Sequence, residues 1–110
     1  MKSELGFQKW EAMGHFFSEG DYLGFNKSDY RGAIAEYEKA WLLLSTPWQQ
    51  QTGGSDILEG IADFALRSRD PELASKTLDS LLPRAHEIAD ASLREACDNL
   101  ADLARQQEQD

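Results

Sequence analysis

The chain has 110 residues, with 20 acidic against 11 basic side chains and a formal net charge of −9 at pH 7. This length fits one compact domain, and a hydrophobic content of 41% is enough to build its core, which excludes wholesale disorder. Proteins that bind nucleic acids or anionic membranes carry a surplus of Lys and Arg, so the charge excludes both partners and leaves a basic protein partner or a merely solubilising surface.

The N-terminal stretch combines many aromatic residues with three glycines, Gly14, Gly20 and Gly24. We expect one or two helices here that end near Asn26, although each glycine weakens a helix interior by about 1 kcal/mol. The pattern leaves open whether residues 1–15 form a helix of the domain or an arm that orders on binding. The large apolar residues of the stretch are Phe7, Trp10, Met13, Phe16, Phe17, Tyr22, Leu23 and Phe25.

The next helix is predicted from about 29 to 45, because apolar side chains recur there at spacings of three and four. Asp29 is its expected N-cap, and Pro47 ends it because proline lacks an amide donor. The polar residues 47–54, which contain Trp48 and two glycines, then predict a loop. The apolar positions of this helix are Ala33, Ile34, Tyr37, Ala40, Trp41 and Leu44.

Three more helices are predicted in the C-terminal half. Ser55 or Asp56 caps the first, and Asp70 caps the second, with Pro71 at its first helical position. Pro83 interrupts the second helix, and the last runs from about 84 to 107 with one apolar and one charged side. No alternating β-pattern longer than a few residues occurs, so the fold class is all-α.

The two halves of the chain share a pattern of small and large residues. The segment 29–41, DYRGAIAEYEKAW, resembles the second helix of a tetratricopeptide repeat, in which small residues let two helices approach and a large residue fills the space between them. The repeated positions are Gly20-Asp21-Tyr22, Ala33 and Tyr37 in the first half, and Ala62-Asp63-Phe64, Ala74 and Leu78 in the second.

The resemblance implies antiparallel helical hairpins in a single domain. Unit one covers residues 16–46, the loop 47–54, unit two 55–83, and a capping helix 84–108. The distance from Ala33 to Ala74 is 41 residues, longer than the usual period of about 34, and the insertion at 48–54 accounts for the difference.

No motif in the sequence indicates catalysis, a cofactor or a metal. His15 and His86 stand far apart and outside any metal-binding spacing, so each is expected to be an ordinary surface or half-buried histidine. Cys97 lies on the apolar side of the last helix, which predicts a small core residue. A hydrolase with a scattered carboxylate and histidine site remains an alternative.

Candidate binding residues follow from the resemblance, since the first helices of tetratricopeptide hairpins line a groove that holds a partner. By register, unit two would contribute Asp56, Glu59, Asp63 and Arg67, and unit one Phe17, Asp21 and Phe25. These residues would suit a basic partner with apolar surface. Several have ordinary alternatives, because Asp56 serves equally as a cap and Glu59 as a solvated side chain. Trp48 is a further candidate anchor, or else a plug over the core.

The leading functional hypothesis is a protein-binding module without catalysis. Size, acidity and hairpin architecture resemble small bacterial immunity proteins, which implies a basic cognate toxin domain as partner. A co-chaperone or assembly adaptor that holds a peptide, and a homodimer or larger homo-oligomer, are the alternatives. With a single cysteine and no apolar signal-peptide stretch at its start, the chain is expected in the reducing cytoplasm.

Overall fold

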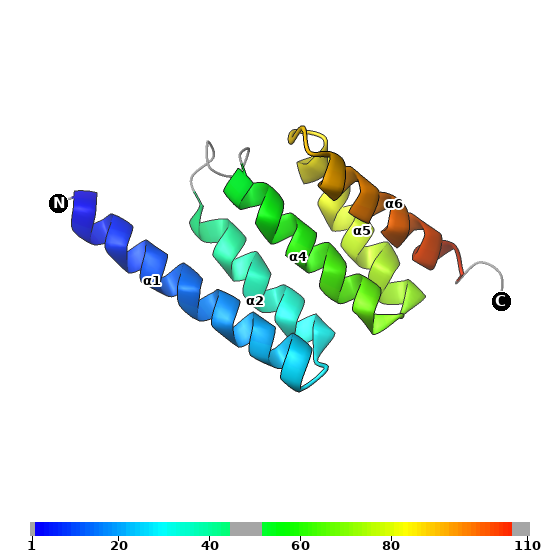
Figure 1. Cartoon of the computed structure of the whole chain (residues 1–110), viewed down its shortest axis with the longest axis horizontal. Helices are drawn as coiled ribbons and strands as arrows, with labels where there is room; N and C mark the ends of the chain where they lie inside the picture. Colours follow the sequence, from blue (N-terminus) through cyan, green and yellow to red (C-terminus); the bar gives the residue numbers. More distant parts are fainter. Residues whose placement is uncertain (1, 45–51, 107–110) are drawn as a thin grey trace.

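The computed structural model describes residues 2–44 and 52–106, and all regular structure in these ranges is helical. The elements in chain order are α1 (Lys2–Asp21), the π-helical turn η1 (Tyr22–Asn26), α2 (Tyr30–Leu43), α4 (Thr52–Ser68), α5 (Pro71–Ala85) and α6 (Ala91–Arg105). Figure 1 shows α1, α2 and α4 side by side as successive antiparallel rods, followed by α5 and α6. The molecule measures 56 × 32 × 17 Å. The helices of the described ranges and their packing on one another confirm the predicted all-α fold of antiparallel hairpins.

The helix α4 lies at the centre of the packing, because it contacts α2, α5 and α6 (Figure 1). Its buried face is wide, as expected for a helix with neighbours on several sides. α5 contributes Leu73, Ala74 and Leu81 to the same core, and α6 contributes Leu93, Cys97 and Leu100. Besides Gly54, the buried residues of α4 among those described are Ser55, Ile57, Leu58, Ile61, Ala62, Phe64 and Ala65.

Both hairpins turn in the same way. A residue with left-handed backbone, Ser28 (φ 55°) or Arg69 (φ 54°), precedes an aspartate that caps the following helix. Asp29 accepts the amide of Gly32 at 3.0 Å, and Asp70 accepts the amide of Glu72 at 3.0 Å. These contacts satisfy amides that the first helical turn leaves free, so both predicted N-caps are confirmed.

The predicted loop and cap before the third long helix are wrong in part. α4 begins at Thr52, so Gly54 and Ser55 lie inside the helix, and neither Ser55 nor Asp56 is its N-cap. Glycine is costly in a helix on local propensity alone, but Gly54 is buried by tertiary packing, which offsets that cost. Ser55 uses its hydroxyl on Asp90 at the start of α6. Trp48 and the rest of residues 45–51 lie outside the described residues.

The boundary between the last two helices also differs from the prediction. α5 continues through Pro83 to Ala85, so Pro83 does not end it, and α6 starts at Ala91 instead of 84. Pro83 lies in the last turn and is exposed, where a missing amide disturbs little of the helix. Asp90 caps α6 by accepting the amide of Leu93 at 3.0 Å.

The N-terminal helix runs without a break through position 15, and η1 continues it to Asn26. Asp21, which joins the two, keeps helical backbone angles of φ −63° and ψ −42°. The predicted end near Asn26 is therefore confirmed. α1 with η1 is longer than α2, its partner in the first hairpin.

A chain of aromatic rings joins the first hairpin to α4. The ring of Tyr37 in α2 lies edge-on to Phe17 of α1 at 5.2 Å and to Phe64 of α4 at 5.1 Å. Phe64 in turn lies 5.3 Å from Phe25 of η1. Such tilted aromatic pairs are favourable by roughly 1 kcal/mol each beyond their burial.

Glycines make room for these rings. A Cβ atom on Gly20 would lie 2.7 Å from the Tyr37 ring, and one on Gly60 would lie 2.4 Å from it. A Cβ on Gly24 would lie 2.3 Å from the ring of Phe64. The glycines that weaken the N-terminal helix on propensity alone are thus required by packing at positions 20 and 24, but not at Gly14, where a Cβ meets nothing within 4 Å.

Replacing Gly60 by alanine should therefore destabilise the protein. The new methyl group overlaps the Tyr37 ring, and overpacking of this kind costs about 1–3 kcal/mol, although alanine favours the helix. The matched change Gly14→Ala should stabilise the protein by up to about 1 kcal/mol. Urea unfolding of both variants gives the two values, and equal effects from the two would contradict the role assigned to the rings.

Candidate functional site

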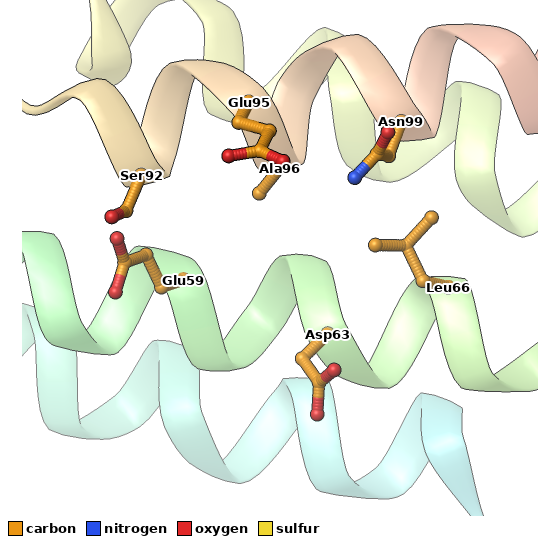
Figure 2. Close-up of a pocket in the computed structure, with 7 residues that line it drawn as sticks. All are labelled: Glu59, Asp63, Leu66, Ser92, Glu95, Ala96 and Asn99. Carbon is orange, nitrogen blue, oxygen red and sulfur yellow. The ribbon is translucent and has the colours of Figure 1, made fainter.

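A groove of about 270 Å³ lies between α4 and α6. Figure 2 shows its two walls, with Glu59, Asp63 and Leu66 on α4 and the remaining lining residues on α6. We call it the α4/α6 groove. The residues from α6 are Ser92, Glu95, Ala96 and Asn99.

The lining of the α4/α6 groove combines carboxylates with apolar side chains. Glu59 on α4 and Glu95 on α6 place one carboxyl group on each wall, while Leu66 and Ala96 supply apolar surface between the helices (Figure 2). No basic side chain is part of the lining among the described residues. The groove is therefore suited to a cationic group on an aliphatic stem.

Asp63 and Arg67 form an ion pair on the outer face of α4. The Arg67 Nε donates to Asp63 Oδ2 at 2.7 Å, and both side chains are 51% exposed. An exposed pair at this helical spacing contributes only about 0.3–0.5 kcal/mol, so a stronger partner can displace it. In Figure 2 Asp63 points away from α6, toward the α2 side of the groove.

Glu59 has a different environment from the exposed carboxylates. Its Oε1 atom is buried without a hydrogen-bond donor among the described residues. Burial raises the pKa of Glu59 first, and the negative charges of Asp90 and Asp56 raise it further. The pKa of Asp90 is lowered instead, because it accepts the Ser55 hydroxyl and the Leu93 amide.

The first unit contributes less to the site than the resemblance implied. Phe17 is half-buried against Tyr37, and Asp21 accepts the Tyr37 hydroxyl at 2.5 Å. Burial, followed by this hydrogen bond, raises the pKa of Tyr37. Both Phe17 and Asp21 thus have structural roles in the aromatic chain.

Phe25 remains accessible beside the acidic face. It is 55% exposed, and the guanidinium of Arg67 lies over its ring at 5.1 Å. Phe25, Arg67 and Asp63 therefore form one continuous contact series on the surface of η1 and α4. Asp56 is exposed on α4 and its charge acts on Glu59. Trp48 lies outside the described residues, so its predicted role stays a prediction.

The lining residues that the sequence did not predict are Leu66 of α4 and the residues from α6. Ser92, Glu95 and Asn99 follow one another at helical spacing on the polar side of that helix. This side of the helix was predicted to face water, as the outer surface of a capping helix. The sequence does place an acidic residue, Glu95, within that spacing. Only the packing of α6 against α4 shows that Glu95 lies across the groove from Glu59.

A second cavity, of about 420 Å³, lies where the end of α5 meets α6. Its lining includes His86, Arg94 and the buried thiol of Cys97. Burial raises the pKa of that thiol, so it is less readily ionised than a free cysteine. Across residues 2–44 and 52–106 no group of three His, Cys, Asp or Glu side chains is placed to hold a metal ion.

The N-cap of α6 gives a direct test of how the groove is held in place. Asp90→Ala removes both the cap and the bond from Ser55, which should lower the free energy of unfolding by about 1–2 kcal/mol. Asp98→Ala on the exposed side of the same helix is the control and should change it by less than about 0.5 kcal/mol. Thermal and urea unfolding measure both, and similar losses for the two variants would argue against the cap.

None of the described helices combines the length and the apolar character needed to cross a membrane. Comparison of the chain with protein-family models, with curated proteins and with solved structures finds no match to any of them.

Proposed function

We propose that this chain is a non-catalytic protein-interaction module that binds a basic protein partner through the α4/α6 groove. The observation that carries the proposal is the pair of carboxyl groups, Glu59 and Glu95, on opposite walls of a groove to which Leu66 and Ala96 add apolar surface. The negative charge of such a groove attracts a positively charged partner and fixes its orientation. The formal net charge of −9 adds a long-range attraction for a basic surface.

The arrangement of helices supports the proposed likeness to tetratricopeptide repeats. α4 packs both against its hairpin partner α5 and against α6, the next helix that faces the same way along the stack (Figure 1). In repeat proteins the face shared by such helices is a common binding surface. The groove lies on this face. It lies between α4 and α6, whereas the resemblance implied a groove between the first helix of unit one and α4.

The partner class that we propose is a basic toxin domain, neutralised in the cytoplasm by this protein as an immunity protein. Support comes from the acidic groove, the small size and the ion pair of Asp63 and Arg67, which a partner can exchange for its own contacts. Blocking a toxin requires only tight binding, so no reactive group on this chain is needed.

Self-association is a second candidate, favoured by exposed aromatic residues in the first hairpin. Trp10 is 65% exposed and Tyr22 is 47% exposed. Large aromatic side chains of this kind are frequent anchors at interfaces. Sedimentation of the purified protein across a range of concentrations distinguishes a monomer from a dimer, and Trp10→Ser should shift a real equilibrium toward monomer.

The proposed function is tested with two variants that each lose three negative charges, one in the groove and one elsewhere on the surface. The groove variant is Glu59→Gln, Asp63→Asn and Glu95→Gln, and the control variant is Glu11→Gln, Asp79→Asn and Glu87→Gln, three exposed carboxylates elsewhere. Each of the three carboxylates contributes roughly 0.2–1 kcal/mol, about 0.6–3 kcal/mol together, so the groove variant should bind the partner about 3- to 160-fold more weakly.

The measurement is a pull-down from the native lysate, followed by affinity measurement with the purified retained protein. The wild type and the control variant should retain one stoichiometric basic protein that is released as salt rises. Equal retention by all three proteins would assign the binding to another surface.

A further inference from the structure

We propose that the cavity between α5 and α6 binds a small fatty acid, a monocarboxylate with an aliphatic tail. Its carboxylate is held by Arg94 and His86, beside the bend that joins the two helices. Its tail lies on the apolar side chains of Leu82, Ala85 and Ile88. This site goes beyond the proposed function, because it shares no residue with the α4/α6 groove.

The cavity has a volume of about 420 Å³ and lies where α5 packs against α6, next to the bend of residues 86–90 (Figure 1). From α6 it is lined by Arg94, Cys97 and Asp98. The α4/α6 groove uses other residues of that helix, among them Glu95 and Asn99. α6 therefore presents different side chains to the two sites, and each site can be altered without altering the other.

Two side chains with unused hydrogen-bond donors line this cavity. Arg94 and His86 are both exposed, and in the part of the chain that the structure describes neither side chain forms a hydrogen bond or an ion pair. Other arginines, such as Arg84 and Arg105, are held by carboxylates. A guanidinium binds a carboxylate through two parallel hydrogen bonds, and an imidazole adds a further donor. The two side chains are thus suited to an anionic head group.

The apolar part of the lining is suited to an aliphatic tail. Ile88 is buried and Ala85 is half-buried, while Leu82 keeps 38% of its surface exposed. The buried Cys97 adds a side chain that behaves as a small apolar group. A tail that covers these side chains removes apolar surface from water, which is the main driving force for binding such a ligand.

The volume of the cavity limits the length of the tail. At about 30 Å³ for each non-hydrogen atom, the cavity of about 420 Å³ accommodates about 14 such atoms. Octanoate and decanoate are within this size, whereas hexadecanoate exceeds it. We therefore expect a fatty acid of short to medium length.

The charges around the cavity favour a ligand with a single negative charge. Asp98 is part of the lining, one helical turn beyond Arg94, and it repels an anion. The net charge of −9 does so over a longer range. A carboxylate loses less to this repulsion than a phosphate monoester, which carries about two charges. Because Asp98 lies farther from the bend than Arg94 does, it also favours a head group at the bend.

The first experiment is an NMR titration of the ¹⁵N-labelled protein with hexanoate, octanoate, decanoate and dodecanoate below their micelle concentrations. The amide signals of Leu82, Ile88 and Arg94 should shift, whereas those of Glu59 and Leu66 in the groove should not. The affinity should rise by up to about fourfold for each added methylene and should level off near dodecanoate, when the cavity is full. No saturable shift at the cavity residues up to about 10 mM octanoate would overturn the site.

The head group is tested with octan-1-ol, which has the same tail without the charge. Arg94→Gln should weaken octanoate binding about 3- to 10-fold, as expected for a partly exposed charged hydrogen bond, and should leave octan-1-ol binding unchanged. The matched control is Arg105→Gln on the same helix, because Arg105 pairs with Asp102 and is not part of the lining. Equal losses of octanoate binding in the two variants would overturn the role assigned to Arg94.

Asp98→Asn should change octanoate binding in the opposite direction. Removing a negative charge from the lining should tighten octanoate binding by up to about fivefold. Asp79→Asn removes the same charge from an exposed position on α5 outside the cavity and should change the affinity much less. Equal effects of the two substitutions would contradict a carboxylate bound in this cavity.

Cys97 is the only cysteine of the chain and provides a second readout. Because it is part of the lining, a bound fatty acid should slow its alkylation by N-ethylmaleimide. Half-protection of the wild type should occur at the dissociation constant measured by NMR, and Arg94→Gln should need a correspondingly higher octanoate concentration. An unchanged alkylation rate at saturating octanoate would show that the ligand binds elsewhere and would overturn the site.

These experiments separate the fatty-acid site from the proposed function. The groove variant should bind octanoate as the wild type does, because none of its three substitutions touches the cavity. If the groove variant loses the partner while no fatty acid binds to the wild type, the fatty-acid site is overturned and the proposed function stands. If octanoate binds as expected while the groove variant keeps the partner, the fatty-acid site stands and the proposed function fails.

Discussion

The fold depends on how closely α2 can approach its neighbours, and the Tyr37 ring sets that distance. The ring occupies space that a side chain at Gly20 or Gly60 would fill, so three helices meet around one aromatic residue. The hydroxyl of Tyr37 reaches Asp21 and fixes the ring along a second direction. Arg84 of α5 adds a tie between the hairpins, with two hydrogen bonds of 2.8 Å to Glu38 and its guanidinium 5.2 Å from the Trp41 ring centre. The first hairpin is thereby held to the second by adjacent residues near the middle of α2, Tyr37 and Glu38, and by Trp41 one turn further along.

This packing determines which face of α4 remains for binding. α2, α5 and α6 cover most of the helix, and only the stripe that contains Asp56, Glu59 and Asp63 reaches the surface or the groove. The start of α6 is fixed to α4 through Ser55 and Asp90, so the two walls of the groove have a defined separation. The same contact places Asp90 beside Glu59. The contact between Ser55 and Asp90 thus determines both the separation of the groove walls and the negative charge beside Glu59.

The helices with strong apolar periodicity and aspartate caps could be predicted from the sequence, because capping and burial are local signals. Asp29 and Asp70 show this clearly. The start of α4 could not be predicted, because Gly54 is buried by tertiary packing and Ser55 bonds to Asp90, 35 positions away. The site was predicted on one wall only. The register of the repeat identified Glu59 and Asp63, but the opposite wall depends on how α6 packs. Phe17 and Asp21 contact Tyr37, and the spacing of residues in the sequence does not reveal these contacts.

The wall that α6 supplies has a consequence for how this protein can diversify. Ser92, Glu95 and Asn99 are exposed, while Leu93, Cys97 and Leu100 on the same helix are buried in the core. Changes at the three outer positions therefore alter what the groove recognises without disturbing the core. A duplicated gene could in this way acquire a new partner through a few substitutions on its last helix, while the aromatic joint between the hairpins is inherited unchanged.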